Sequence, residues 1–100
     1  MIQRIVLIKL SDDQATPAGR NAVMEHTKTV LTALPKVRNL TINTPSDDKN
    51  QQSWDVKITL HFDDMESLEE YRVHPTHRDY VDEFLGPQLA VIKAWNFEVT

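Results

Sequence analysis

Residues 54–62, WDVKITLHF, alternate between large apolar and polar side chains more regularly than any other part of the chain. The apolar members of this stretch are Trp54, Val56, Ile58, Leu60 and Phe62. The polar members between them are Asp55, Lys57, Thr59 and His61. Successive side chains of a strand point to opposite faces, so this pattern predicts a β-strand with its apolar face against a core.

The residues before this strand predict a strand, a helix and a second strand. Residues 2–10 carry apolar side chains on both faces, which is typical of a strand covered on both sides. A helix is expected over residues 17–34, with Thr16 as its N-cap and a proline at its first position. Residues 37–44 are β-branched and alternating, which predicts another strand. The polar stretch 45–53 is expected to be a loop.

Two short helical pieces are expected after the quoted strand. Asp63 or Asp64 would cap the first, which runs to about Val73. His74-Pro75 interrupts it, because proline lacks an amide proton and crowds the preceding turn. Thr76 would then cap a second piece, HRDYVDEFL, which Gly86-Pro87 is expected to end.

A last alternating segment, residues 91–99, completes the order β-α-β-β-α-β. With short connections and right-handed crossovers, this order predicts a ferredoxin-like α+β fold with a four-stranded antiparallel sheet. Residues 1–100 are expected to form one domain. The face of the sheet without helices would carry Ile5, Leu7, Trp95, Phe97 and Val99. We therefore expect a homodimer, with two such faces packed into a dimeric α/β barrel.

Composition limits the classes of function. The net charge is −4, with 15 acidic and 11 basic residues, which argues against nucleic-acid binding. The absence of cysteine excludes disulfides and thiolate chemistry. No stretch approaches 18 apolar residues, so we expect no membrane contact and a cytoplasmic location. Two glycines are too few for a phosphate-cradling loop or a dinucleotide fingerprint, and no cofactor is predicted.

The segment YRVHPTHRDY, residues 71–80, holds the candidate chemistry. His74 and His77 have the spacing of a metal pair, but Pro75 disrupts the helical face that they would share, so no metal site is predicted. His74 is expected to satisfy backbone groups at the kink, and it is kept as a candidate ligand-binding residue. His77, beside Tyr71 and Tyr80, could move protons near neutral pH, or the same group could simply hold a helix to the sheet.

Arg4 is the other candidate, because its strand position points it toward the helices. A buried arginine requires an anion. Its partner would be Glu25, Glu69 or Glu70, or the carboxylate of a ligand. The predicted pocket is lined by Arg4, Val6, Val56, Ile58, Tyr71 and His77, with His74 and Tyr80 as further ligand-binding residues.

Four segments together resemble the stress-responsive A/B barrel (Dabb) family over essentially the whole chain. They are MIQRIVLIKL, WDVKITLHF, EEYRVHPTHRDYV and VIKAWNFEV. The most specific part is Tyr71-x-x-His74-Pro75-x-His77, placed after a strand that ends in His61-Phe62. The resemblance implies a dimeric α+β barrel with facing sheets, and most members have no assigned reaction.

One similar group, plant polyketide cyclases, closes a linear polyketide between helices and sheet. The resemblance implies that His77 would act as the acid/base of such a cyclase, with Tyr71 as the tyrosine upstream of it. Arg4 stands where family members often have a histidine, and Val56 stands where the cyclases have another. These differences favour an acidic ligand over the same cyclisation.

Three functions are therefore expected as alternatives. The first, and the one we expect, is a barrel that binds a small, partly apolar molecule, neutral or acidic, with no assigned reaction. The second is a cofactor-independent enzyme, such as a cyclase, isomerase, lyase or oxygenase, in which His77 and Tyr71 transfer protons. The third is a structural or stress-response assembly without a small-molecule site.

Overall fold

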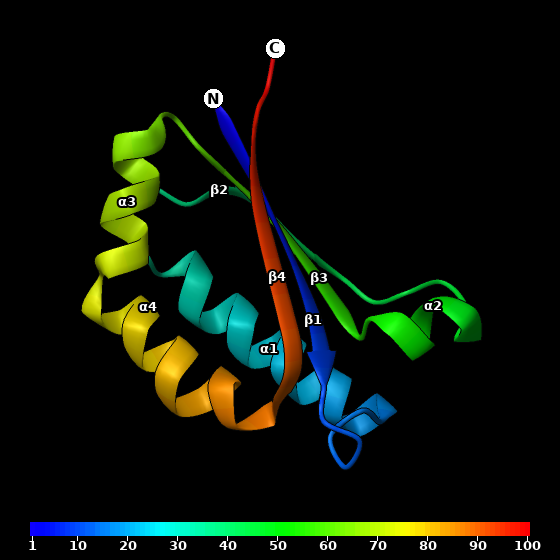
Figure 1. The fold of residues 1–100 in the computed structure, drawn as a ribbon. Helices are drawn as coiled ribbons and strands as arrows, with labels where there is room; N and C mark the ends of the chain where they lie inside the picture. The colour runs from blue at the N-terminus through cyan, green and yellow to red at the C-terminus, as the bar shows by residue number, and fades with distance from the viewer.

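The computed structural model describes residues 1–100 as one four-stranded antiparallel sheet with helices (Figure 1). The strands are β1 (Ile2–Leu10), β2 (Arg38–Asn43), β3 (Val56–Phe62) and β4 (Leu89–Glu98). Their order in the sheet is β2-β3-β1-β4. The sequence-based prediction of a ferredoxin-like α+β fold is confirmed, and so are its four strands.

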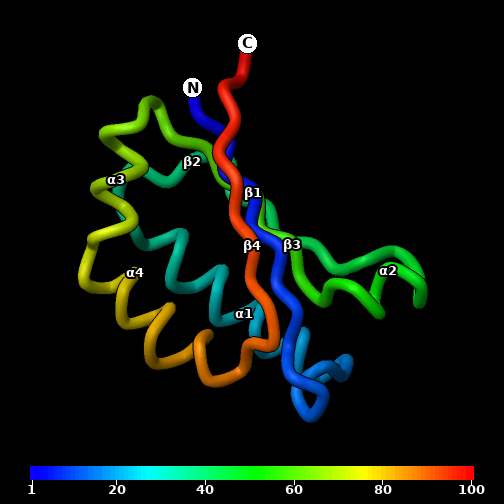
Figure 2. The backbone as a smooth tube through the Cα atoms, viewed as in Figure 1, coloured from blue at the N-terminus to red at the C-terminus, as the bar shows by residue number.

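The helices lie on one side of this sheet, except for one that extends away from it. They are α1 (Pro17–Thr32), α2 (Asp48–Ser53), α3 (Met65–Val73) and α4 (Pro75–Asp79), followed by a π-helical turn η1 (Tyr80–Leu85) and a 3₁₀ turn η2 (Gly86–Gln88). In Figures 1 and 2, α1, α3 and α4 lie on one side of the strands, and α2 extends away from them. None of these helices has the length and apolar character needed to cross a membrane.

The core lies between the helices and one face of the sheet. Alternate residues of β1, namely Ile2, Val6, Ile8 and Leu10, are buried on this face. In β3 the buried alternate residues are Val56, Ile58, Leu60 and Phe62. The two strands pair antiparallel, so that Val6 lies opposite Ile58. Arg4 belongs to the same face of β1, which places a cation at the edge of an apolar core.

The other face of the sheet has no helix against it. Ile5 of β1 lies opposite Trp95 of β4, and Gln3 lies opposite Phe97. The side chains of Trp95 and Phe97 are 44% and 51% exposed. Large aromatic side chains at this exposure on neighbouring positions form an apolar patch, as the alternation in the sequence predicted.

The predicted loop at residues 45–53 is wrong in its second half, because Asp48–Ser53 form α2. Asp47 has an extended backbone, and its carboxylate accepts a hydrogen bond from the Asn50 amide at 2.8 Å. This N-cap stabilises one helical turn even though α2 has no buried residue. The helix has no apolar stripe, so its hydrophobic pattern could not reveal it.

The predicted polar face of the quoted strand is wrong at Asp55. The ladder with β1 begins at Val56, which lies opposite Ile8, and Asp55 precedes it. The Asp55 side chain is fully buried, where it accepts hydrogen bonds from Lys9 Nζ and the Leu10 amide, both at 2.8 Å. Arg20 of α1 donates a third bond at 3.1 Å. The alternation therefore stops one residue before the strand, and Asp55 turns into a polar cluster.

The join after α3 also differs from its prediction. Asp64 is the cap of α3, as expected, and its carboxylate accepts from the Ser67 amide at 2.8 Å. The next helix begins at Pro75 and is capped by His74, whose Nδ1 accepts from the Thr76 amide at 3.1 Å. Thr76 is therefore inside the helix and is not its cap. Pro75 fits because a first-turn residue needs no amide proton.

The last helical segment ends at Leu85, before Gly86 and Pro87, as predicted, but a short 3₁₀ turn follows it. The Gly86 amide donates to the Val81 carbonyl, which makes η1 a π turn, and the chain continues through η2 to Gln88. Pro87 lies in the first turn of η2, a position that tolerates proline. The wide turn of η1 carries Tyr80 and Leu85 into the core.

Candidate functional site

A cavity of about 190 Å³ lies between the helix-facing side of the sheet and the α3–α4–η1 segment. Its lining comes from α1, α3, α4, η1 and three strands: Arg4, Val6, Leu31, Ile58, Tyr71, Arg72, His77, Arg78, Tyr80, Val81, Leu85, Ile92 and Ala94. Most of this wall is apolar, and the polar groups are aromatic, imidazole or guanidinium. The two residues predicted to be catalytic, His77 and Tyr71, are thus brought together here with Arg4.

Arg4 enters the cavity from β1 and has no carboxylate partner. Its Nη1 donates to Asn96 Oδ1 of β4 at 2.8 Å, and it forms no ion pair with Glu25, Glu69 or Glu70. Of the two alternatives expected for its partner, an internal glutamate is therefore not found. Burial lowers the pKa of the Arg4 guanidinium, but an arginine stays protonated at any physiological pH.

The other four arginines all contact a carboxylate. Their ion pairs are Arg20–Asp55, Arg38–Asp63, Arg72–Glu69 and Arg78–Asp82. Arg4 is the exception, and it is also the one arginine on the core-facing side of the sheet. A half-buried cation with only an amide partner favours binding of an anion from outside the protein.

Tyr71 of α3 and His77 of α4 form an aromatic pair with ring centroids 4.2 Å apart. Tyr71 also packs on Phe62 of β3 at 4.9 Å, which fixes the ring against the sheet. Burial raises the pKa of the Tyr71 phenol above its usual range, while the charge of Arg4 acts in the opposite direction. The Tyr71 hydroxyl thus stays protonated at neutral pH, and it forms no hydrogen bond within the protein.

His77 is held in one orientation by the end of α3. Its Nδ1 lies 3.2 Å from the Arg72 carbonyl oxygen. A carbonyl can only accept, so Nδ1 carries the proton of this bond, and Nε2 is left without a protein partner. Burial lowers the pKa of His77, and the charges of Arg4, Arg78 and Arg72 lower it further, against the opposing effect of that carbonyl. The ring is therefore neutral at pH 7, with a free lone pair.

Tyr80 closes the cavity on the η1 side. Its hydroxyl and Thr27 Oγ1 of α1 are 2.5 Å apart in a buried hydrogen bond. Burial raises the pKa of Tyr80 to about 12, although the bond to Thr27 lowers it. This tyrosine already has a partner, whereas Tyr71 does not. Tyr80 therefore fits a wall of the cavity better than a proton donor.

Two of the predicted ligand-binding residues lie elsewhere. Val56 is fully buried and is absent from the lining, because the cavity begins one inward-facing position farther along β3, at Ile58. His74 lines a separate hollow of about 60 Å³ beside Leu34, and its Nδ1 is used as a helix cap. The other predicted ligand-binding residues, Arg4, Val6, Ile58 and Tyr80, all line the cavity.

Arg72 and Arg78 were not predicted to be site residues. Both lie at the rim with about half of the side chain exposed, paired with Glu69 at 2.9 Å and Asp82 at 3.2 Å. Charged residues on short helices resemble an ordinary solvent-exposed face, so only their spacing around His77 could have indicated them. Together with Arg4, they place three guanidinium groups around one small cavity.

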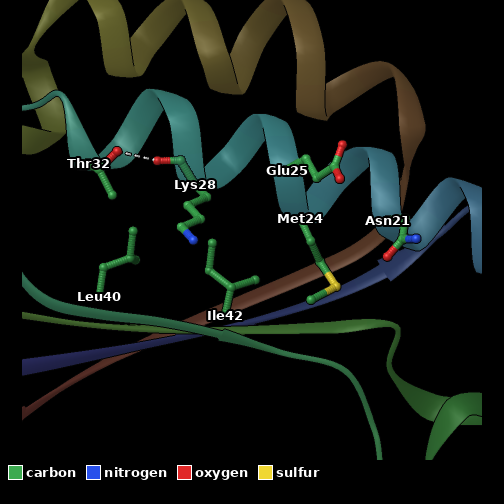
Figure 3. A pocket seen from close by; sticks show the side chains of 7 residues that line it. All are labelled: Asn21, Met24, Glu25, Lys28, Thr32, Leu40 and Ile42. Atoms are coloured by element: carbon green, nitrogen blue, oxygen red, sulfur yellow. Dashed lines mark hydrogen bonds between the residues drawn. The ribbon is translucent and has the colours of Figure 1, made fainter.

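A larger hollow, of about 340 Å³, lies between α1 and the edge strand β2 (Figure 3). Met24 and Lys28 point from α1 toward Leu40 and Ile42 of β2 in this view. No histidine, tyrosine or arginine lines it. No group of three or more histidine, aspartate or glutamate side chains in the structure is placed to hold a metal ion. The Arg4–Tyr71–His77 cavity combines a guanidinium, a phenol and an imidazole on one lining, and it is the candidate site.

Comparisons with known proteins agree with this architecture. A Dabb family protein with a ferredoxin-like fold from Mesorhizobium loti matches with a TM-score of 0.84 and 17% identity, over 99% of this chain and 96% of that one. A dimeric ferredoxin-like protein of unknown function from Thermobifida fusca matches with a TM-score of 0.80 and 23% identity, over 98% and 90%. The hydroxynitrile lyase of Passiflora edulis matches with a TM-score of 0.81 and 12% identity, over 99% of this chain and 93% of that one.

These identities are low enough that the structural matches support the fold alone. A search of curated protein sequences gives no match. The family model described as the stress responsive A/B barrel domain matches residues 2–99. The chain therefore belongs to the stress responsive A/B barrel (Dabb) family.

Proposed function

We propose that this protein binds a small, partly apolar carboxylate in the Arg4–Tyr71–His77 cavity. The observation that carries this proposal is that Arg4 alone among the arginines has no carboxylate partner. The apolar body of the ligand would contact Val6 and Ile58, while its carboxylate would pair with the guanidinium.

Electrostatics around the cavity support an anionic ligand. Arg72 and Arg78 add positive potential at the rim, although each is already paired and exposed. His77 is neutral, so it adds no charge but can accept a hydrogen bond at Nε2. A neutral ligand would leave the Arg4 charge partly desolvated without compensation.

Binding of benzoate, followed by NMR of the labelled protein, tests this proposal. Benzoate is expected to perturb the resonances of His77 and Tyr71, and Arg4→Gln should weaken its binding by about ten-fold or more, as expected for loss of a charge-assisted hydrogen bond. Arg38→Gln is the matched control, because Arg38 is exposed and does not line the cavity. Equal binding by both variants would contradict the proposal.

The second candidate function is cofactor-independent proton transfer by His77 and Tyr71. A neutral imidazole with a free Nε2, next to a protonated phenol without a partner, is a base beside a hydrogen-bond donor. A structural neighbour with this fold is a hydroxynitrile lyase, so the fold is compatible with catalysis. Nε2 of His77 would act as the base and remove a proton from the substrate carbon next to a carbonyl. Tyr71 would donate a hydrogen bond to the oxygen of the resulting enolate.

Solvent deuterium exchange into phenylpyruvate tests the enzyme function, since this probe has an acidic carbon next to its ketone and a carboxylate for Arg4. Wild-type protein is expected to accelerate exchange, His77→Gln to abolish the acceleration, and Tyr71→Phe to reduce it. The rate should fall as pH drops through the pKa of His77. If wild-type protein exchanges no faster than the His77→Gln variant, the protein is a binding protein and not an enzyme. If it also binds no benzoate, a structural assembly is favoured.

We also propose that the protein forms a homodimer through the helix-free face of the sheet. The exposed side chains of Trp95 and Phe97 support this, together with the dimeric state of the Thermobifida fusca neighbour. Trp95→Lys combined with Phe97→Lys should give monomers in sedimentation experiments. A wild-type protein that sediments as a monomer at high micromolar concentration would contradict the proposal.

A further inference from the structure

We propose that Asn96 is a positioning residue that holds Arg4 in the cavity while leaving its charge free, so that the site selects carboxylates over neutral molecules of the same shape. This inference rests on the proposed binding function and adds a residue and a selectivity to it. Asn96 lies on β4, outside the segments that the sequence singled out, and it does not line the cavity itself.

The register of the sheet places Asn96 next to Arg4. Arg4 of β1 lies directly opposite Asn96 of β4 in the antiparallel ladder. Cross-strand partners have their side chains on the same face, so both point to the helix-facing side. The hydrogen bond from Nη1 to Oδ1 is 2.8 Å, and it is the one hydrogen bond that either side chain makes.

The chemistry of an amide differs from that of the other arginine partners. A guanidinium has five N–H donors, and Asn96 accepts from one of them without neutralising the charge. Nε and Nη2 have no protein partner, and together they form an edge that can bind a carboxylate with two parallel bonds. An aspartate at this position would pair with Arg4 as Asp82 pairs with Arg78, and the cation would be compensated from within.

His77 supplies an internal reporter of this charge. The positive charge of Arg4 contributes to the lowered pKa of His77. A carboxylate that pairs with Arg4 would offset that contribution, whether it came from a ligand or from residue 96. Ligand binding and the Asn96→Asp substitution should therefore both raise the pKa of His77.

The experiment compares wild type, Asn96→Asp and Asn43→Asp in NMR titrations of the full-length protein. Asn43 lies on the opposite edge strand β2 and is absent from the cavity lining, so this control adds the same charge elsewhere. Asn96→Asp is expected to raise the pKa of His77, and Asn43→Asp to leave it unchanged. An unchanged His77 pKa in Asn96→Asp would overturn the inference without any ligand.

Binding of benzoate and of its neutral isostere benzamide gives the second measurement. Wild type and Asn43→Asp should bind benzoate about ten-fold more tightly than benzamide. Asn96→Asp should lose this preference through weaker binding of benzoate, with benzamide affected by less than about two-fold. A preference that survives in Asn96→Asp would overturn the inference.

The two proposals can fail separately in these measurements. If wild type binds neither probe but Asn96→Asp raises the pKa of His77, the pairing of residues 4 and 96 holds and the carboxylate-binding function fails. If all three proteins prefer benzoate equally, the binding function holds and the role of Asn96 fails. Circular dichroism spectra and melting temperatures of the variants exclude unfolding as the cause of either result.

Discussion

The two ends of β1 place an arginine in opposite electrostatic settings. At the Leu10 end, Arg20 donates to Asp55, whose carboxylate also accepts from Lys9 and from the Leu10 amide. At the Ile2 end, Arg4 has one neutral amide partner and faces a cavity. The first cluster satisfies its carboxylate completely, whereas the second leaves cationic donors unused.

This difference indicates separate roles for the two clusters. Asp55 joins β1, α1 and the residues before β3 through bonds that are buried or largely buried, so its contribution is to stability. Arg4 joins only β1 and β4, and its remaining donors have no internal use. A cation beside a cavity with one neutral hydrogen-bond partner and no carboxylate partner is better explained by a ligand.

The largest expected effect is that of Asp55→Asn on stability. The substitution leaves Lys9 and Arg20 as uncompensated cations, and their side chains are only 20% and 12% exposed. We expect the free energy of unfolding to fall by about 3 kcal/mol. Urea denaturation measures this, and a loss below about 1 kcal/mol would mean that the cluster does not differ from a surface ion pair.

Protonation of Asp55 in acid should also lower the free energy of unfolding, but by less than Asp55→Asn. Burial alone raises the pKa of Asp55, but the hydrogen bonds from Lys9, Leu10 and Arg20 outweigh it and hold the pKa below its ordinary value. The resulting stability is fully present above the unfolded-state pKa of about 4, and it is lost as pH falls through the lower folded-state value. Urea midpoints measured between about pH 5 and pH 2 should fall less steeply in Asp55→Asn than in wild type.

Arg4→Met should change stability little, in contrast to Asp55→Asn. The variant removes a half-buried cation that has no carboxylate partner, and it keeps a long apolar side chain against the core. We expect an unfolding free energy within about 1 kcal/mol of wild type, with any change toward greater stability. A loss as large as that of Asp55→Asn would show that Arg4 serves the fold, and the binding proposal would lose its main support.

The sequence predicted much of this comparison, because strand alternation is set by burial on one face. The alternation along β1 predicted that Arg4 lies on the same face as Val6. Thr16 correctly predicted the start of α1, where its side chain accepts a hydrogen bond from the Gly19 amide at 3.0 Å. The segment 71–80 singled out Tyr71 and His77, and the resemblance to the Dabb family implied roles for the pair. These positions follow from local patterns that tertiary contacts then reinforce.

What could not be predicted depends on contacts between distant segments. Asp55 looked solvent-exposed because alternation was extended one residue beyond the strand, and only α1 and the Leu10 end of β1 show why it turns inward. Asn96 became relevant only through the register of β4 against β1. Arg72 of α3 and Arg78 of α4 belong to no hydrophobic pattern, so the sequence did not distinguish them from ordinary charged surface residues.

The smallest expected effect on stability is that of Asp63→Asn. This substitution tests whether burial or short contact distance determines how much an ion pair stabilises the fold. The Arg38–Asp63 ion pair is 2.8 Å long, the same as the Lys9–Asp55 pair. Its side chains are 55% and 52% exposed, against 20% and 0% for Lys9 and Asp55. Water competes for exposed charges and salt screens them, so we expect a loss of no more than about 0.5 kcal/mol, vanishing at high salt. If Asp63→Asn instead costs as much as Asp55→Asn in the same urea experiments, short contact distance rather than burial sets the value of these pairs, and an unpaired Arg4 would no longer be a sign of binding.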